Sequence, residues 1–225
     1  MFKDFLTALL EKMLTHLVKH PDFFTKKEGA QVKELENLSI PATFKKYLEK
    51  VSAKEFMADL EVVTAYIHNP KNAQIKENEF FKHFAEFLTL ELARKIDHLD
   101  SNFYLLSKKK RDEIIEKLIS GESQLAKSLK TILTNYTYQQ LAAEIIELGV
   151  KVAAAPYLVV QSPREIDSDL KREIRTQLTE KYPLSFPAFQ VNKKIIGGIR
   201  IFHNGQTSDH SWLSRVLRFT SLTTA

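Results

Sequence analysis

Apolar residues recur at intervals of three and four through the first two thirds of the chain. The clearest case is residues 2–18, where one stripe is formed by Phe2, Phe5, Leu6, Leu9, Leu10, Met13, Leu14 and Leu17. This spacing predicts an amphipathic helix whose stripe faces a core. Pro21 ends the pattern, because the residue before a proline resists helical geometry.

Further helices are predicted over residues 30–37, 44–67, 76–96, 108–121, 123–133 and 138–152, and the second of these is expected to break near Ser52. Residues 76–96 carry an aromatic stripe formed by Phe80, Phe81, Phe84, Phe87, Leu88 and Leu92. Such a stripe is typical of a helix-bundle core. Residues 1–152 are therefore expected to form one helical bundle with short connections.

The pattern changes after residue 152. Residues 153–156 read as a linker, because Pro156 forbids a continuing helix. Strands are predicted over 157–160, 184–191 and 195–202, and helices over 166–182 and 209–220. The expected fold is mainly α, with a helical bundle followed by a small β-α-β-β-α domain at residues 157–225.

Residues 191–211 form the most distinctive sequence segment in the chain. The apolar pair Ile195-Ile196 runs directly into Gly197-Gly198, which indicates a bulge or a close approach of another backbone. Asn204-Gly205 then predicts a tight turn. Asp209 is expected to cap the final helix.

These residues resemble the C-terminal signature of the delta subunit family of F-type ATP synthases, called the oligomycin-sensitivity-conferring subunit in mitochondria. The matching positions are Ile195, Ile196, Gly197, Gly198, Ile199, Arg200, Asp209, Ser211, Leu213 and Leu217. The structural signature among them is Ile196, Gly197, Gly198, Arg200, Asp209 and Ser211. The strong match covers roughly a tenth of the chain, and a weaker one extends back to Tyr157. The family's Ala/Arg/Tyr-rich opening helix is not found, so the N-terminal part is divergent.

The resemblance implies a non-catalytic stator subunit that needs no cofactor. Such a connector links the catalytic head, through the N-termini of the alpha subunits, to the b subunits of the peripheral stalk during proton-driven ATP synthesis. It implies a chain that is not a homo-oligomer and lies on the inner face of a bacterial cell membrane through its complex. The candidate partner-binding residues are Phe5, Leu9, Arg215 and Arg218.

Composition agrees with a helical, cytoplasmic protein. The 225 residues are 44% hydrophobic, with 15 phenylalanines, 6 glycines and no cysteine, which excludes disulfides and thiolate metal sites. No apolar run approaches the roughly 18 residues of a membrane span. Asp4 and Glu11 make the N-terminus unlike a secretory signal or a transit peptide. The chain is therefore expected to keep its N-terminus.

The net charge of +5 falls in the C-terminal third. Residues 151–225 hold 11 Lys and Arg against 6 Asp and Glu, whereas the remainder holds 22 of each. A solvated basic surface is the simplest interpretation. The alternative is a nucleic-acid-binding or regulatory helical adaptor whose basic face is formed by Lys193, Lys194, Arg200, Arg215 and Arg218.

Catalytic motifs are not found in the sequence. It has no glycine-rich phosphate loop and no Gly-x-Ser-x-Gly elbow. His16 and His20 have the four-residue spacing of a zinc pair, but no third ligand is evident, and no metal is expected. Asp209, His210 and Ser211 are the residue types of a catalytic triad, yet adjacency along the chain is not triad geometry. An enzyme is the hypothesis with the least support.

Overall fold

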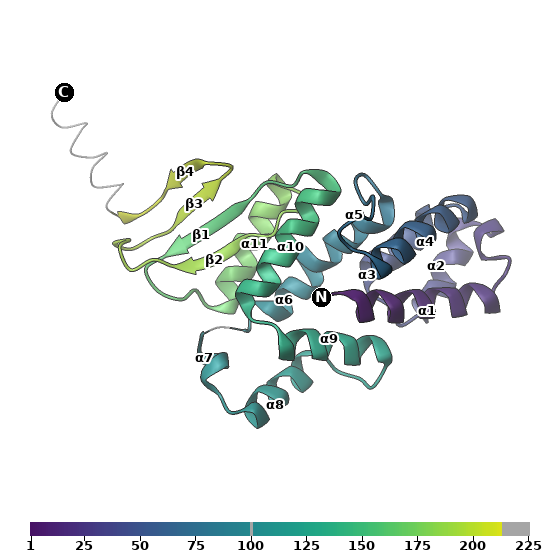
Figure 1. The fold of residues 1–225 in the computed structure, drawn as a ribbon, viewed down its shortest axis with the longest axis horizontal. Helices are drawn as coiled ribbons and strands as arrows, with labels where there is room; N and C mark the ends of the chain where they lie inside the picture. The colour runs from purple at the N-terminus through teal and green to yellow at the C-terminus, as the bar shows by residue number, and fades with distance from the viewer. Residues whose placement is uncertain (100, 213–225) are drawn as a thin grey trace.

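The first helices of the chain form a bundle at one end of the molecule (Figure 1). In this computed structural model, residues 1–99 and 101–212 are described. The bundle contains α1 (Lys3–Lys19), a 3₁₀ turn η1 (Phe23–Thr25), α2 (Glu28–Glu36), α3 (Ala42–Lys50) and α4 (Ala53–His68). The predicted break near Ser52 is confirmed: Ser52 caps α4 and forms a reciprocal capping box with Glu55.

The aromatic segment forms one continuous run of helix through the centre of the molecule. It comprises α5 (Glu79–Glu86), a π-helical turn η2 (Phe87–Leu92) and α6 (Ala93–Ile96). Its start lies three residues later than predicted, because Glu77 has a positive φ of 57° and Asn78 caps the helix. The predicted stripe is buried throughout. Phe5 and Phe87 stack with ring centroids 4.9 Å apart.

Four helices follow and lead toward the sheet. They are α7 (Ser101–Leu105), α8 (Lys108–Leu118), α9 (Gln124–Asn135) and α10 (Tyr138–Ala153). The short α7 had no periodic signal in the sequence. A capping box between Thr137 and Gln140 starts α10, and Ala154, at a left-handed φ of 50°, ends it. In the described residues, no helix is long and apolar enough to cross a membrane.

The C-terminal part is a four-stranded mixed sheet with one crossover helix. Its elements are β1 (Leu158–Ser162), α11 (Ser168–Lys181), β2 (Ala188–Val191), β3 (Arg200–His203) and β4 (Gln206–Asp209), and the strand order is β2-β1-β3-β4. Strands β1 and β2 are parallel, whereas β1–β3 and β3–β4 are antiparallel. The mainly α fold class with a small C-terminal β element is therefore confirmed.

Two strand predictions began too early. The strand predicted at residue 184 begins at Ala188, because Leu184 has a left-handed φ of 61°. The strand predicted at residue 195 begins at Arg200, because Gly197 and Gly198 have φ values of 67° and 74° and interrupt any extended run. Ile195 to Ile199 is instead a loop, with Ile195 anchored in the interior.

The final helix was predicted to begin at Asp209, and this start is wrong. Residues 206–209 form β4, a polar strand that the sequence analysis missed because it has no alternating apolar side chains. Backbone pairing with β3 holds it, as in the register Arg200↔Asp209. The rest of the predicted helix, residues 213–220, lies outside the described residues.

The sheet and the bundle share one interior. Alternate residues of β2 face opposite ways: Ala188 joins the buried cluster of the bundle, whereas Phe189 packs with Val160 and Ile174 beneath α11. Phe186, just before β2, is also part of the bundle's cluster. The C-terminal element is therefore packed directly onto the helices.

A buried ion pair crosses this junction. Arg175 of α11 donates to both carboxylate oxygens of Asp97 at the end of α6, at 2.6 and 3.2 Å. Both side chains are almost fully buried, at 3% and 1% exposure. Arg175 also donates to the carbonyl of Pro187 at 3.3 Å and lies 4.3 Å from the centre of the Phe186 ring. Arg175 therefore connects α11 both to the end of α6 and to the segment that precedes β2.

Arg175→Met is expected to lower the free energy of unfolding by about 3–5 kcal/mol, because it leaves the Asp97 carboxylate buried and unpaired. Arg172→Met on the same helix is the control. Arg172 forms an exposed pair with Asp169, and such pairs contribute about 0–1 kcal/mol. Urea unfolding of both variants measures the difference, and equal losses would contradict the role given to Arg175.

Candidate functional site

The glycine pair holds two backbone segments in close contact. A Cβ atom on Gly198 would lie 2.5 Å from the carbonyl oxygen of His210, so no other residue fits there without a backbone shift. Hydrogen bonds on either side fix this approach: His210 N donates to Ile199 O at 2.9 Å, and Trp212 N donates to Gly197 O at 3.2 Å. The predicted close approach of another backbone is confirmed, and that backbone is residues 210–212.

Arg200 and Asp209 of the signature lie opposite each other on β3 and β4. The guanidinium of Arg200 donates to Asp209 Oδ2 at 2.7 and 3.1 Å, and Asp209 Oδ1 accepts from the backbone N–H of Ser211 at 2.8 Å. The hydrogen bonds from Ser211, with those from Arg200, lower the pKa of Asp209 to about 2. Asp209 therefore holds the strand pair and the glycine loop together, and is not a helix cap.

The two isoleucines ahead of the glycines have different surroundings. Ile195 is buried, whereas Ile196 is 61% exposed, and the exposed Trp212 is bonded through its backbone N–H to the adjacent Gly197. Ser211 is buried at 2% exposure. The signature therefore combines buried positions that fix the loop with apolar side chains that remain on the surface.

The predicted partner-binding residues of α1 are core residues. Phe5 and Leu9 are both fully buried, because they lie on the α1 stripe that packs against the aromatic core. Phe5 and Leu9 were expected to contact a partner directly, but their side chains are not accessible for such a contact. Arg215 and Arg218 lie outside the described residues.

A second apolar row on α1 runs from the core to the surface, because Leu10 is buried whereas Leu14 and Val18 are exposed. Leu10, Leu14 and Val18 follow each other at intervals of four and, with Ile67 of α4, line an open groove of about 590 Å³. Val18 is 79% exposed, and the groove is edged by Thr7, Glu11, Thr15 and Lys19. The spacing of residues 10, 14 and 18 could have predicted this groove, but the sequence analysis assigned Leu10 and Leu14 to the core stripe.

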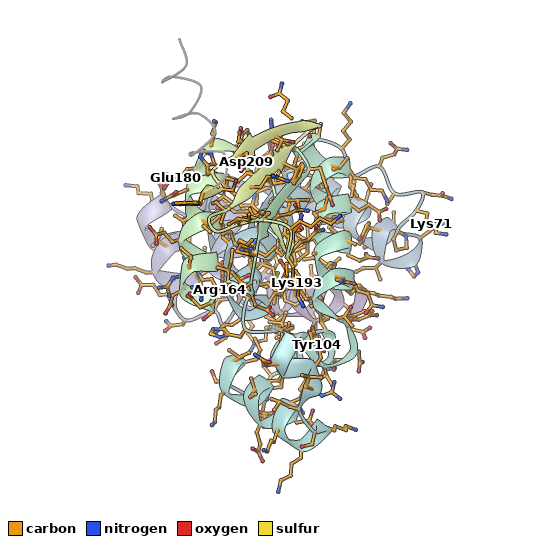
Figure 2. The ribbon with its side chains drawn as sticks, turned by 90° about the vertical axis from the view of Figure 1, so that its left-hand side faces the viewer. Lys71, Tyr104, Arg164, Glu180, Lys193 and Asp209 are labelled. Carbon is orange, nitrogen blue, oxygen red and sulfur yellow. The ribbon has the colours of Figure 1, made fainter. Side chains whose placement is uncertain are left out.

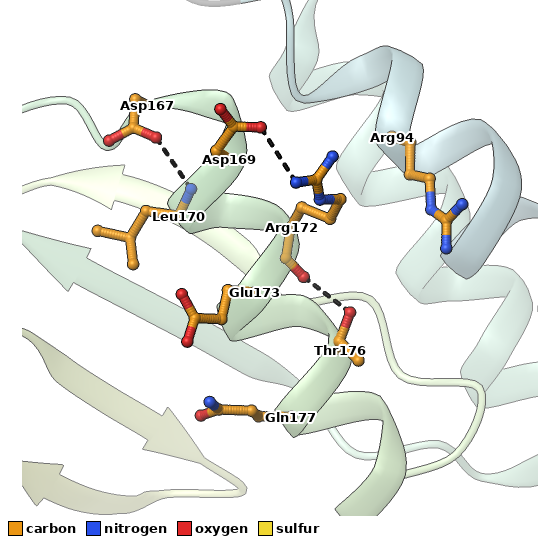
Figure 3. Close-up of a pocket in the computed structure, with 8 residues that line it drawn as sticks. All are labelled: Arg94, Asp167, Asp169, Leu170, Arg172, Glu173, Thr176 and Gln177. Atoms are coloured by element: carbon orange, nitrogen blue, oxygen red, sulfur yellow. Dashed lines mark hydrogen bonds and ion pairs between the residues drawn. The ribbon is translucent and has the colours of Figure 1, made fainter.

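A polar hollow lies where α11 passes near α6 (Figure 3). Its charged and polar groups contact one another: Asp167 caps the helix by accepting from Leu170 N at 2.9 Å, and Asp169 pairs with Arg172 at 3.2 Å. Asp167 is thus the N-cap of α11, and Asp169 lies in its first turn, where the helix dipole favours a negative charge.

The histidine pair of α1 lies side by side, with ring centroids 4.7 Å apart. Burial, with the neighbouring His20, lowers the pKa of His16. Lys26 forms ion pairs with Asp22 and Glu34 beside these rings. Within residues 1–99 and 101–212, no three potential ligands are arranged to hold a metal ion.

Comparison with known proteins adds no relative. No model of a known protein family matches this chain, and no curated protein matches it in sequence.

Gly198→Ala is expected to destabilise the protein more than Gly205→Ala does. Both glycines have a positive φ, at 74° and 82°, but a Cβ on Gly205 meets nothing within 4 Å. The positive φ costs about 1–2 kcal/mol for alanine at either position. The contact with His210 adds about 1–3 kcal/mol at Gly198 alone. Chemical unfolding measures both, and equal costs would contradict the close approach.

Asp209→Asn is expected to lower the thermal midpoint of unfolding above pH 4 and to have no effect near pH 2. The folded pKa of about 2 lies below the ordinary 3.8, so the unfolded chain binds the proton first as the pH falls. The stability from this carboxylate is therefore present above about pH 4 and lost toward pH 2. Asp169→Asn, on the exposed side of α11, is the control. A difference between Asp209→Asn and wild type that persists at pH 2 would contradict this assignment.

Proposed function

We propose that this protein is a non-catalytic connector of the stator of an F-type ATP synthase. It links the N-terminal helices of the alpha subunits to the b subunits of the peripheral stalk. A connector of this kind carries no reaction. It resists the torque of the rotor, and therefore needs two separate docking surfaces joined without a hinge.

The outward groove on α1 is the observation that carries the proposal. An amphipathic helix binds to such a groove with apolar side chains at intervals of three and four. The row of Leu10, Leu14 and Val18 extends along about two turns of α1, and its edges carry both Glu11 and Lys19. A groove of this length suits one amphipathic helix, and in this proposal its occupant is the N-terminal helix of an alpha subunit.

The position of the groove also supports the connector. It lies on α1 and α4, at the opposite end of the molecule from the sheet that carries the glycine signature (Figure 1). Between the two ends run the continuous helix from α5 to α6 and the buried pair of Asp97 and Arg175. Force applied at one end is thus transmitted through packed helices and not through a linker.

The basic-face alternative has no comparable support. Of the residues expected to form this face, Arg200 is held by Asp209, Lys193 and Lys194 are exposed, and Arg215 and Arg218 lie outside the described residues. A nucleic-acid surface needs lysines and arginines that reach phosphates.

Val18→Asp is expected to weaken binding of a synthetic peptide of the cognate alpha subunit's N-terminal helix. Losing the burial of one valine costs about 1.5 kcal/mol or more, so the dissociation constant should rise at least about tenfold. Val150→Asp is the control, because Val150 is exposed on α10, outside the groove. Calorimetry at two salt concentrations measures both variants.

The wild-type chain should bind one peptide with little dependence on salt. If the peptide does not bind and the chain instead binds DNA or RNA in a salt-dependent manner, the connector proposal is wrong. An equal loss in both variants would place the peptide elsewhere than the α1 groove.

A further inference from the structure

A large hollow lies between α10, α7 and the outer edge of β2. It measures about 1080 Å³, and Tyr104, one of the residues that line it, is labelled in Figure 2. Its lining is mainly apolar and aromatic, including Leu99, Ala142, Ile146, Ile166, Phe189 and Val191. Sites for small molecules in proteins have this size and this mixture of an apolar wall with a few polar groups.

Lys171 of α11 supplies a positive charge on this wall. The residue is 3% exposed, so its ammonium group is removed from water. Among the described residues, its acceptors are distant: the carbonyl oxygen of Asp97 lies 3.4 Å away and the Glu165 carboxylate lies 3.6 Å away. An ammonium group has three N–H donors, and leaving them poorly paired in a buried position is costly. A ligand acceptor would remove that cost.

A second donor lines the same hollow. The hydroxyl oxygen of Tyr138 accepts a hydrogen bond from Phe189 N at 2.9 Å. Burial raises the pKa of Tyr138 to about 12, so the hydroxyl keeps its proton at neutral pH. The ammonium of Lys171 lies 5.9 Å from the centre of the Tyr138 ring. The two groups therefore provide adjacent donors beside an apolar wall.

Two of the carboxylates near the hollow are paired with cations other than Lys171, and the third forms a long ion pair with it. Glu147 at its rim is paired with Lys151 at 2.6 Å. Asp97 is held by Arg175 through both of its oxygens. Glu165 has a side chain that is 35% exposed and lies beyond hydrogen-bond distance of Lys171. A ligand carboxylate would share the Lys171 ammonium with Glu165, whose own ion pair with it is long at 3.6 Å.

We infer that this hollow binds a small carboxylic acid with an apolar body, whose carboxylate contacts Lys171 and Tyr138. The apolar body lies along Ile146, Phe189 and Val191. This site is distant from the groove on α1, and the inference does not depend on the connector function.

Octanoate and octan-1-ol test the inference, since they share the apolar chain and differ in the carboxylate. Calorimetry on the full chain should show octanoate binding at least about tenfold more tightly than octan-1-ol, since a hydrogen bond to a charged group contributes about 1.5–3 kcal/mol. Lys171→Met should abolish the preference for octanoate. Equal binding of the two probes by the wild-type chain would overturn the inference.

Two further variants keep the test decisive if Lys171→Met fails to fold. Glu165→Gln removes the competing carboxylate and should tighten octanoate binding without tightening octan-1-ol binding. Ala143→Trp fills the hollow from an exposed position on α10 and should weaken the binding of both octanoate and octan-1-ol. Octanoate binding that is unchanged in Ala143→Trp would show that it occurs elsewhere and would overturn the inference.

Discussion

The buried contact between Asp97 and Arg175 is the constraint on which the arrangement of this molecule depends. It joins the end of the central helix to the crossover helix of the sheet, and both charged groups are removed from water. A buried charge whose partner moves away is left uncompensated at a cost of several kcal/mol. Relative motion of the bundle and the sheet is therefore opposed by electrostatics as well as by apolar packing. The rings of Phe186 and Phe189 cover the guanidinium and exclude water from the pair.

The buried ion pair supplies the rigidity that the proposed connector requires. A stator subunit must transmit force between two partners, and a flexible link between its two ends would absorb that force. Here Ala188 and Phe186 extend the core of the bundle under the sheet, so a single interior runs from the α1 end to the β1–β2 end. The hollow that contains Lys171 lies beside the same junction. Occupation of that hollow would add contacts between α10, α11 and β2, where the two parts meet.

The glycine loop allows residues 210–212 to lie against the segment that leads into β3. Gly198 removes the side chain that would collide with His210, and Asp209 connects the strand pair to Ser211. The loop is thereby fixed with Ile196 on its surface, and Trp212 of the adjoining segment is exposed as well. The conformation of Gly197 and Gly198 thus also determines that the neighbouring Ile196 stays exposed.

The sequence by itself determined most of the helical elements, the position of the change to β structure and the close approach at Gly198. Each of these follows from local terms: periodic burial of the phenylalanines, the geometry imposed by Pro156, and the freedom of glycine at positive φ. Only the tertiary structure decided which apolar residues of α1 stay on the surface, because Leu14 is as apolar in the sequence as the buried Leu9. It alone revealed β4, whose polar residues are held by pairing with β3. It also made Arg175 a buried partner of Asp97, 78 residues away in the chain. Such choices depend on which surfaces meet after folding, and neither residue type nor spacing along the chain specifies them.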